Sequence, residues 1–180
     1  TLSGAEGRFG GGKKDLAMLF VYANIDNYLV DDGRLAFVIT QTVFKTTGAG
    51  DGFRRLRYHL NGGPEVVINP LVVHDLSSMQ VFEGATNRTA VIVVEKSRKP
   101  TRFPVPYTVW KKIGRGRAPE WTLPEALRET ERRELAAGPL KGDVLGGAWV
   151  TAPKPVFDIV EHGRIGTIVA VNNTSCLAAQ

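Results

Sequence analysis

The chain of 180 residues contains a single cysteine, Cys176. One cysteine excludes an intramolecular disulfide framework and a cysteine-rich zinc module, and it is typical of a reducing compartment such as the cytoplasm. The longest apolar stretch, around residues 16–25, falls well short of the roughly 20 residues that a membrane span requires. The three histidines, His59, His74 and His162, lie far apart without metal-ligand spacing, so we expect structural roles for them. The sequence therefore predicts a cytoplasmic protein with no metal centre and no membrane partner.

The beginning of the chain lacks the marks of a secretory leader. The first residue is threonine rather than methionine, and residues 1–12 are rich in glycine without a hydrophobic period, which predicts a flexible lead-in. Gly7 to Lys13 match the letters of a phosphate-binding P-loop, but no strand precedes them. Lys14 also stands where a serine or threonine would hold magnesium. We therefore expect a piece of a longer protein with a flexible start, not a nucleotide triphosphate site.

Hydrophobic patterns predict alternating helices and strands between residues 15 and 94. Asp15 can cap a helix that ends before Gly33. Its apolar residues recur at three- and four-residue steps: Leu16, Leu19, Phe20, Ala23 and Val30. Residues 35–39 form a continuous apolar run, which is typical of a strand buried on both faces in a parallel sheet. We expect a short basic helix over residues 53–60 and β-branched strands over 66–73 and 89–94.

This order predicts the later half of an open α/β sheet, closed by a strand pair that the loop from Asp75 to Arg88 joins. The strand, glycine-rich turn and helix that begin such a fold have no counterpart before Asp15. Farther along, a charged helix is expected over residues 123–137, beginning at Pro124. The segment after Gly146 has no clear pattern.

The positive charge of the chain is concentrated in one window. Residues 98–117 contain seven basic residues and no acidic one, and the rest of the chain has 16 basic against 18 acidic residues. The seven are Arg98, Lys99, Arg102, Lys111, Lys112, Arg115 and Arg117. Phe103, Tyr107, Trp110 and Trp121 are interleaved with this window or follow it closely. Such a mixture favours contact with a nucleic-acid backbone and its bases, although a solvated linker whose aromatic residues pack on the α/β body has the same composition.

Two short motifs have ordinary explanations. Gly48-Ala49-Gly50 before a helix could offer backbone N–H groups to a phosphate, but such glycines more often make a turn. Asn87-Arg88-Thr89 has the letters of a glycosylation site, which carries no weight without a secretory signal.

Several segments of the chain form one pattern when their order is considered together. They are Lys14-Asp15-Leu16 with Phe20, residues 32–39, Asp75-Leu76 with Val81-Phe82, and residues 87–94. This pattern resembles N6-adenine DNA methyltransferases of restriction–modification systems, which have a helix with a short Asp/Asn-Leu signature, a Gly-Gly-x-Leu-x-Phe-Val-type strand, and a loop with Val-Phe before the last antiparallel strand. The resemblance covers residues 13–96, with Val105-Pro106-Tyr107 and Trp110 similar to the exit from the catalytic domain.

The resemblance implies roles for individual residues. Phe82 matches the aromatic residue that stacks on an adenine flipped out of the duplex, and an extruded base needs such a face to replace its lost stacking. Phe20, Lys14 and Asp15 match the surroundings of S-adenosylmethionine, although the helical spacing of Phe20 alone predicts a core residue. Asn87 and Arg88 would lie beside the base pocket, where Arg88 could meet a phosphate. Residues 40–42 (Thr-Gln-Thr) fall at the carboxyl end of a strand, where such sheets place ligands.

The resemblance also implies a division of the chain into segments, and it shows which parts of the family's catalytic domain the sequence lacks. It implies a lead-in (1–12), the C-terminal half of a methyltransferase-like domain (13–97), a basic aromatic connector (98–122) and the start of a target-recognition or accessory region (123–180). The Asp/Asn-Pro-Pro-aromatic loop and the glycine-rich cofactor loop of the family do not occur in this sequence. We therefore expect this chain alone to be inactive and to bind S-adenosylmethionine weakly or not at all. The expected partners are double-stranded DNA and the remainder of the methyltransferase.

Two other functions fit the same residues. The chain could be a non-enzymatic nucleic-acid-binding module whose α/β body is a scaffold. It could also be a structural or interaction domain, in which case the basic window would be buried or neutralised. An upstream Asp/Asn-Pro-Pro-aromatic motif would favour the methyltransferase, and salt-independent binding would favour the interaction domain.

Overall fold

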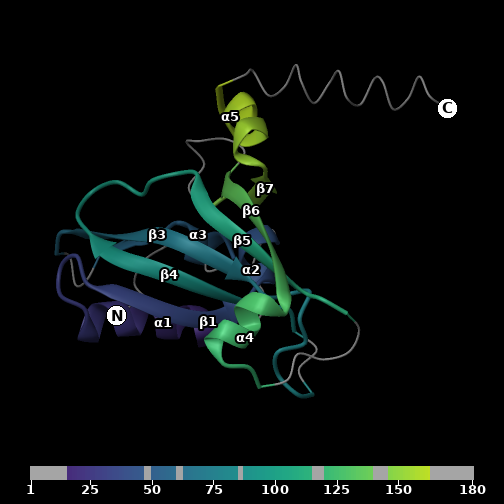
Figure 1. Ribbon diagram of the computed structural model, residues 1–180. Helices are drawn as coiled ribbons and strands as arrows, with labels where there is room; N and C mark the ends of the chain where they lie inside the picture. The colour runs from purple at the N-terminus through teal and green to yellow at the C-terminus, as the bar shows by residue number, and fades with distance from the viewer. Residues whose placement is uncertain are drawn as a thin grey trace.

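The computed structural model describes residues 16–46, 50–59, 63–84, 87–114, 120–139 and 146–162. These segments form a mixed α/β fold around one seven-stranded sheet with the order β1-β4-β3-β5-β6-β7, and β2 pairs with β3 (Figure 1). The strands are β1 (Arg34–Thr40), β2 (Arg57–His59), β3 (Glu65–Asp75), β4 (Thr89–Ser97), β5 (Val105–Lys112), β6 (Thr130–Pro139) and β7 (Trp149–Ala152). Only β3 and β5 pair in parallel, and all other pairs are antiparallel. This mixed sheet does not have the parallel strand order of a Rossmann fold.

Five helices accompany the described part of the sheet. They are α1 (Leu16–Tyr28), α2 (Thr42–Lys45), α3 (Asp51–Arg54), α4 (Leu123–Arg128) and α5 (Lys154–His162). Figure 1 shows α1 running alongside β1, and α5 standing out from the body beyond β7. Within the described ranges, no helix combines the length and the hydrophobicity needed to cross a membrane.

The first helix is confirmed, but the prediction of its buried face is wrong. Val21 and Ile25 are fully buried, and Met18 and Tyr22 nearly so. The predicted face includes Leu16, Phe20 and Val30, which are all exposed; they are 66%, 57% and 77% accessible to solvent. Because almost every position of α1 is uncharged, two faces satisfy the helical period and the sequence cannot choose between them.

The end of α1 is tied to β4 by a lysine. Lys96 Nζ donates to the carbonyl oxygens of Leu29 at 2.9 Å and Ile25 at 3.3 Å. The last carbonyls of a helix lack partners within it, and a cation there also meets the negative end of the helix dipole. Gly33 follows, and a side chain there would collide with Val30 O, since a Cβ would lie 2.8 Å from it. The tight turn thus places α1 antiparallel to β1.

The prediction that residues 35–39 form a strand is confirmed, but their expected burial in a parallel sheet is wrong. β1 pairs only with β4, in antiparallel register from Arg34 opposite Glu95 to Thr40 opposite Thr89. Leu35, Phe37 and Ile39 pack against the core, whereas Val38 on the other face is 49% exposed. The continuous apolar run of residues 35–39 therefore forms an edge strand, and one of its two apolar faces is partly exposed to solvent.

The strand pair expected over 66–73 and 89–94 is confirmed as β3 and β4, joined by the loop of residues 76–88. β4 is antiparallel to both β1 and β3, so β1, β3 and β5 all run in the same direction. Their carboxyl ends therefore meet at one edge of the sheet, which we call the carboxyl edge.

Two predicted helices are shorter than expected and are followed by strands. The basic helix expected over 53–60 is a single turn, because Leu56 adopts a left-handed conformation with φ of 54° and Arg57–His59 then pair with β3. The helix expected over 123–137 ends at Arg128, and Thr130–Pro139 pair with β5 along eight positions. Helix α4 begins at Leu123, one residue before the predicted start at Pro124. This end is stabilised because the Glu125 carboxylate accepts hydrogen bonds from the backbone and hydroxyl of Thr122. Pairing in the sheet overrides the helical preference of the charged residues beyond it.

The core lies on the face of the sheet that α1, α2 and α3 cover. Ile92 and Val94 of β4, Val73 of β3 and Tyr107 of β5 are fully buried on that face. β5 lies within the segment interpreted from the sequence as a connector, yet it joins the same sheet. The last strand, β7, belongs to the segment after Gly146 that had no clear pattern, and its Trp149 stacks on Phe44 of α2 with ring centroids 5.1 Å apart. The aromatic residues after Arg98 therefore help to build the body of the protein.

Candidate functional site

Three buried polar side chains meet at the carboxyl edge. Gln41 directly follows β1, Asp75 ends β3 and Tyr107 lies on β5, and each is at most 3% exposed. Tyr107 Oη donates to Asp75 Oδ2 at 2.5 Å, and Gln41 Nε2 donates to the same oxygen at 3.2 Å and to Tyr107 Oη at 3.3 Å. Lys45 Nζ of α2 lies 5.5 Å from the centre of the Tyr107 ring. We call Gln41, Asp75 and Tyr107 the polar triad.

The polar triad holds the loop of residues 76–88. Asp75 Oδ1 accepts the backbone N–H of Ser77 at 2.9 Å, where the loop begins. The backbone N–H of Gln41 donates to Arg88 O at 2.7 Å, where the loop ends. Leu76 N–H donates to Thr89 O at 3.0 Å and closes the loop between these points.

Phe82 lies on this loop with its ring half exposed. Its side chain is 49% accessible, and it does not belong to the hydrophobic core. Its neighbours Glu83 and Gly84 are exposed as well, and Gly84 has a positive φ of 68°, which lets the chain turn there. An aromatic ring placed this way at a sheet edge can stack on a flat apolar group that comes from solvent.

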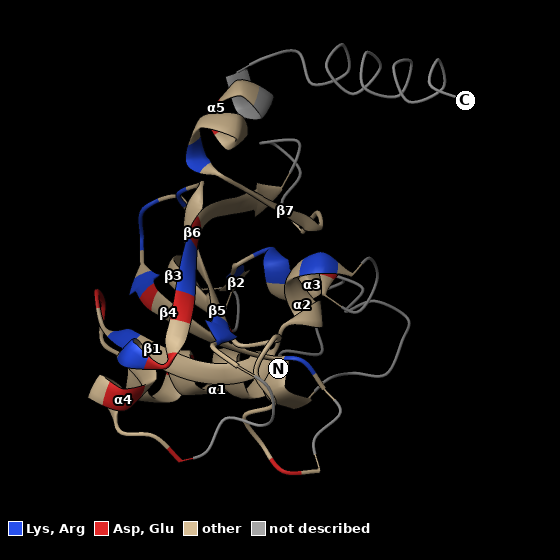
Figure 2. Ribbon diagram, turned by 45° about the vertical axis from the view of Figure 1, so that its right-hand side comes forward, with Lys and Arg blue, Asp and Glu red and all other residues tan. Residues whose placement is uncertain are grey.

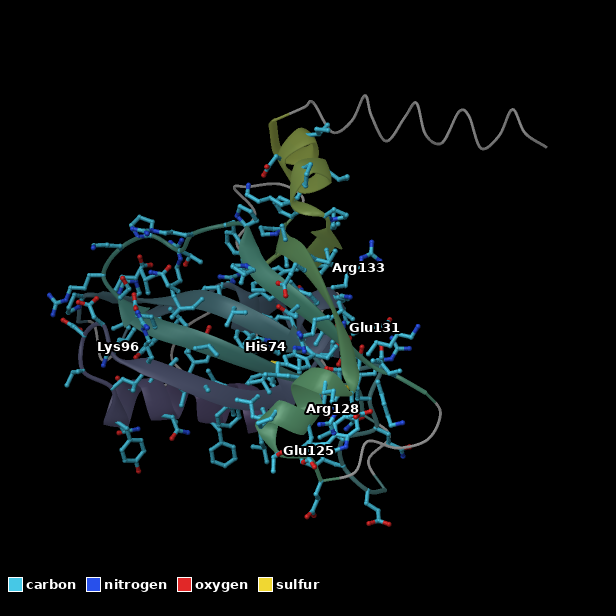
Figure 3. The ribbon with its side chains drawn as sticks, viewed as in Figure 1. His74, Lys96, Glu125, Arg128, Glu131 and Arg133 are labelled. Carbon is cyan, nitrogen blue, oxygen red and sulfur yellow. The ribbon has the colours of Figure 1, made fainter. Side chains whose placement is uncertain are left out.

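The predicted nucleic-acid-binding residues do not form one patch. Arg98, Lys99 and Arg102 lie on the loop between β4 and β5, whereas Lys111 and Lys112 end β5 at the carboxyl edge. The eight residues of β5 separate the two groups by about 26 Å. Figure 2 shows Lys and Arg dispersed over several elements, and in Figure 3 Lys96, next to the first group, lies far from His74 beside the carboxyl edge. Among the described members of this set, Lys111 and Lys112 lie at the same edge as the Phe82 loop, and Asn87 and Arg88 belong to the loop itself.

Two further features reduce the available positive charge. Arg98 forms an exposed ion pair with Asp31, with Nε 2.9 Å from Oδ2. On β6, Glu131 and Glu134 flank Arg132 and Arg133, and Glu131 and Arg133 project outward from the strand (Figure 3). Arg132 lies over the ring of Trp110, 5.4 Å from its centre, and Trp110 Nε1 donates to His74 Nδ1 at 3.2 Å. His74 is thus part of a packed cluster, as expected of a structural histidine.

The residues implied for the cofactor are only partly described. Lys14 and Asp15 lie outside the described residues, as do Arg115, Arg117, the P-loop-like segment and Cys176. Phe20 is described, and its exposed ring shows that its interpretation as a core residue is wrong. Of the three implied residues only Phe20 is described, and one exposed ring on α1, beside the amide of Asn24, is not sufficient to form an S-adenosylmethionine pocket. In the described ranges no three His, Cys, Asp or Glu side chains gather as a metal site would require.

A second buried polar cluster is centred on Arg54, and no sequence pattern predicted it. Its guanidinium group is fully buried and donates to Val43 O, Gly146 O and Gly147 O, and to Asp51 Oδ1 at 2.6 Å. Burial lowers the pKa of Arg54, and the carboxylate of Asp51 opposes this shift. Gly50 is required beside it, because a Cβ there would lie 2.3 Å from Val43 O. Gly50 therefore serves close packing, and Gly48 and Ala49 lie outside the described residues.

Burial raises the pKa of three tyrosines. It raises the pKa of Tyr58 to about 12, and it raises the pKa of Tyr22 and of Tyr107 further, with the hydrogen bond to Asp75 adding to the shift of Tyr107. Above pH 10 the unfolded chain loses these protons first, so the free energy of unfolding should fall as the pH rises from 10 to 12. Each tyrosine contributes about 1.4 kcal/mol per pH unit.

Urea unfolding at pH 9 to 12 measures this slope. Tyr107→Phe removes one of the three groups, and we expect a shallower fall in stability with pH than in the wild type. The same slope in both proteins would contradict the assignment of a protonated, buried Tyr107.

No protein-family model matches the sequence, and no curated protein is significantly similar to it.

Proposed function

We propose that the chain is part of a cytoplasmic, S-adenosylmethionine-dependent N6-adenine DNA methyltransferase, in which Phe82 stacks on the adenine flipped out of the duplex. The half-exposed ring of Phe82 on a loop fixed at the carboxyl edge carries this proposal. A base that leaves the duplex loses its stacking, and an aromatic ring in solvent contact can replace it. The methyl transfer itself belongs to the parent protein, because this sequence lacks the loops that hold the cofactor and the target amino group.

The arrangement of strands supports the proposal. The resemblance implies a loop with Val-Phe just before a last antiparallel strand, and here Val81 and Phe82 precede β4, which lies antiparallel between β1 and β3. The sheet of residues 34–97 would then be the later half of a methyltransferase sheet. Lys111, Lys112 and Arg88 at the same edge would contact phosphates near the base.

Binding to a disrupted duplex tests the stacking role of Phe82. The chain should prefer a duplex with an abasic site opposite an adenine over the fully paired duplex, because the unpaired adenine is easy to extrude. Phe82→Ala should remove this preference, at a cost of about 1–3 kcal/mol in binding to the disrupted duplex. Binding of both duplexes should weaken from low to high salt, as phosphate contacts require. Fluorescence anisotropy measures the affinities of both proteins for both duplexes at each of the two salt concentrations.

Tyr28→Ala is the matched control, since Tyr28 is an 80% exposed aromatic residue at the far end of α1 from the carboxyl edge. It should keep the preference of the wild type. Salt-sensitive binding that is indifferent to Phe82 would reject the stacking role and leave a nucleic-acid-binding module as the better description. Binding that does not depend on salt would indicate an interaction domain without nucleic acid.

A further inference from the structure

Hydrogen bonds join the members of the polar triad to one another and to the start of the Phe82 loop. Asp75 accepts three donors with two oxygens: Ser77 N–H on Oδ1, and Gln41 Nε2 and Tyr107 Oη on Oδ2. Tyr107 Oη in turn accepts from Gln41 Nε2. Two chain segments that lie more than 30 residues from Asp75 in sequence are therefore fixed to its carboxyl group. A buried network with every member bonded specifies one arrangement of the groups that it joins.

Gln41 acts on both ends of the Phe82 loop. Its side chain bonds to Asp75, where the loop begins, and its backbone N–H bonds to Arg88 O, where the loop ends. Within the described part of the loop, backbone hydrogen bonds run from Met79 N–H to Leu76 O and from Val81 N–H to Met79 O. Beyond Val81, residues 82–84 are exposed. The hydrogen bonds at the two points where the loop joins the sheet therefore help to set the position of the Phe82 ring.

We infer that Gln41 is a positioning residue that clamps the Phe82 loop to the carboxyl edge, and that Asp75 and Tyr107 hold the Gln41 side chain in place. The clamp itself is a property of this chain, while its effect on DNA rests on the proposed function. A ring that is held in place loses less conformational freedom when it stacks on a base. The clamp therefore favours stacking without touching the base.

Three variants separate the parts of the clamp. Gln41→Met keeps the length of the side chain and the backbone bond to Arg88 O but removes the amide. Tyr107→Phe removes the hydroxyl alone. Asp75→Asn keeps the shape but has one acceptor oxygen, so it cannot serve both Ser77 and the other two donors. Gln80→Met is the matched control, because Gln80 is an exposed glutamine on the same loop.

Hydrogen exchange of backbone amides tests the clamp without DNA. Each clamp variant should raise the exchange rates of the Gln41, Leu76 and Ser77 amides by about tenfold, the effect of losing one buried hydrogen bond. The amides of Val73 and Ile92 in the core report the loss of global stability and should rise by no more than the loop amides, and Gln80→Met should leave both groups unchanged. Unchanged loop amides would overturn the inference. A larger rise in the core amides than in the loop amides would overturn it too, because the triad would then serve stability alone.

The duplex assay adds the functional readout. We expect Gln41→Met and Tyr107→Phe to lower the preference for the disrupted duplex severalfold, while their binding to paired DNA stays that of the wild type. If the wild type shows no such preference but the exchange result holds, the proposed function fails and the clamp stands. If the preference exists and the clamp variants retain it in full, Gln41 does not position Phe82.

Discussion

Arg54→Met is expected to lower the free energy of unfolding by about 3–5 kcal/mol, because it leaves buried carbonyl groups without a donor. The guanidinium group joins Val43 O on α2 to Gly146 O and Gly147 O before β7, so one side chain supports two segments. Methionine can fill the volume of the arginine stem, but it donates no hydrogen bond. The carboxylate of Asp51 is half exposed and can be solvated after the change.

Urea unfolding measures the effect, with Arg57→Met as the control. Arg57 forms an exposed ion pair with Glu65, and its Nη1 lies 3.4 Å from the carboxylate. Such surface pairs contribute at most about 1 kcal/mol. Similar losses in the two variants would show that the Arg54 cluster does not hold α2 and the β7 segment together.

Phe44→Ala is expected to lower the free energy of unfolding by about 3–5 kcal/mol, the usual cost of truncating a buried phenylalanine. Phe44 is fully buried, stacks on Trp149 of β7 and meets Phe53 of α3 edge-on with ring centroids 6.5 Å apart. Its removal would open a cavity between the sheet end and the two short helices.

Phe20→Ala provides the comparison for that variant. Phe20 also lies on a helix, but its ring is 57% exposed, so we expect a change within about 0.5 kcal/mol. Thermal or urea unfolding of both variants distinguishes the two positions. A large loss for Phe20→Ala would restore the core role that the helical spacing suggested.

The strands β1, β3 and β4 could be predicted because runs of β-branched and aromatic residues are local signals. Their pairing could not be predicted in full. The apolar run of residues 35–39 is compatible with a buried parallel strand and with an edge strand that exposes one apolar face. The sequence does not distinguish the two, because the difference depends on the pairing of β1 with β4. The helix predicted over 123–137 failed for a similar reason, since the charged residues 131–134 favour a helix locally and pair with β5 in the folded protein.

The candidate site was foreseen as separate residues and not as a cluster. Gln41 was noted at a strand end, Asp75 beside a loop and Tyr107 among aromatic residues, but their contacts span 32 to 66 positions. No local pattern carries such contacts. The burial of Arg54 could not be predicted from the sequence, because its hydrogen bonds to backbone carbonyls form only where three distant segments come together in the fold. Gly50, which allows that approach, was the nearest hint.

The most direct test of the account is whether the Phe82 ring meets an unpaired adenine. Nuclear magnetic resonance of chain labelled in its eight phenylalanines can follow each ring as a duplex with an abasic site opposite adenine is added, with Phe82→Leu assigning its signals. We predict ring-current shifts of the Phe82 signals that grow with this duplex and are absent with the paired one. Unmoved Phe82 signals, together with shifted amides of Lys111 and Lys112, would show that the chain meets only the DNA backbone and would contradict the stacking role.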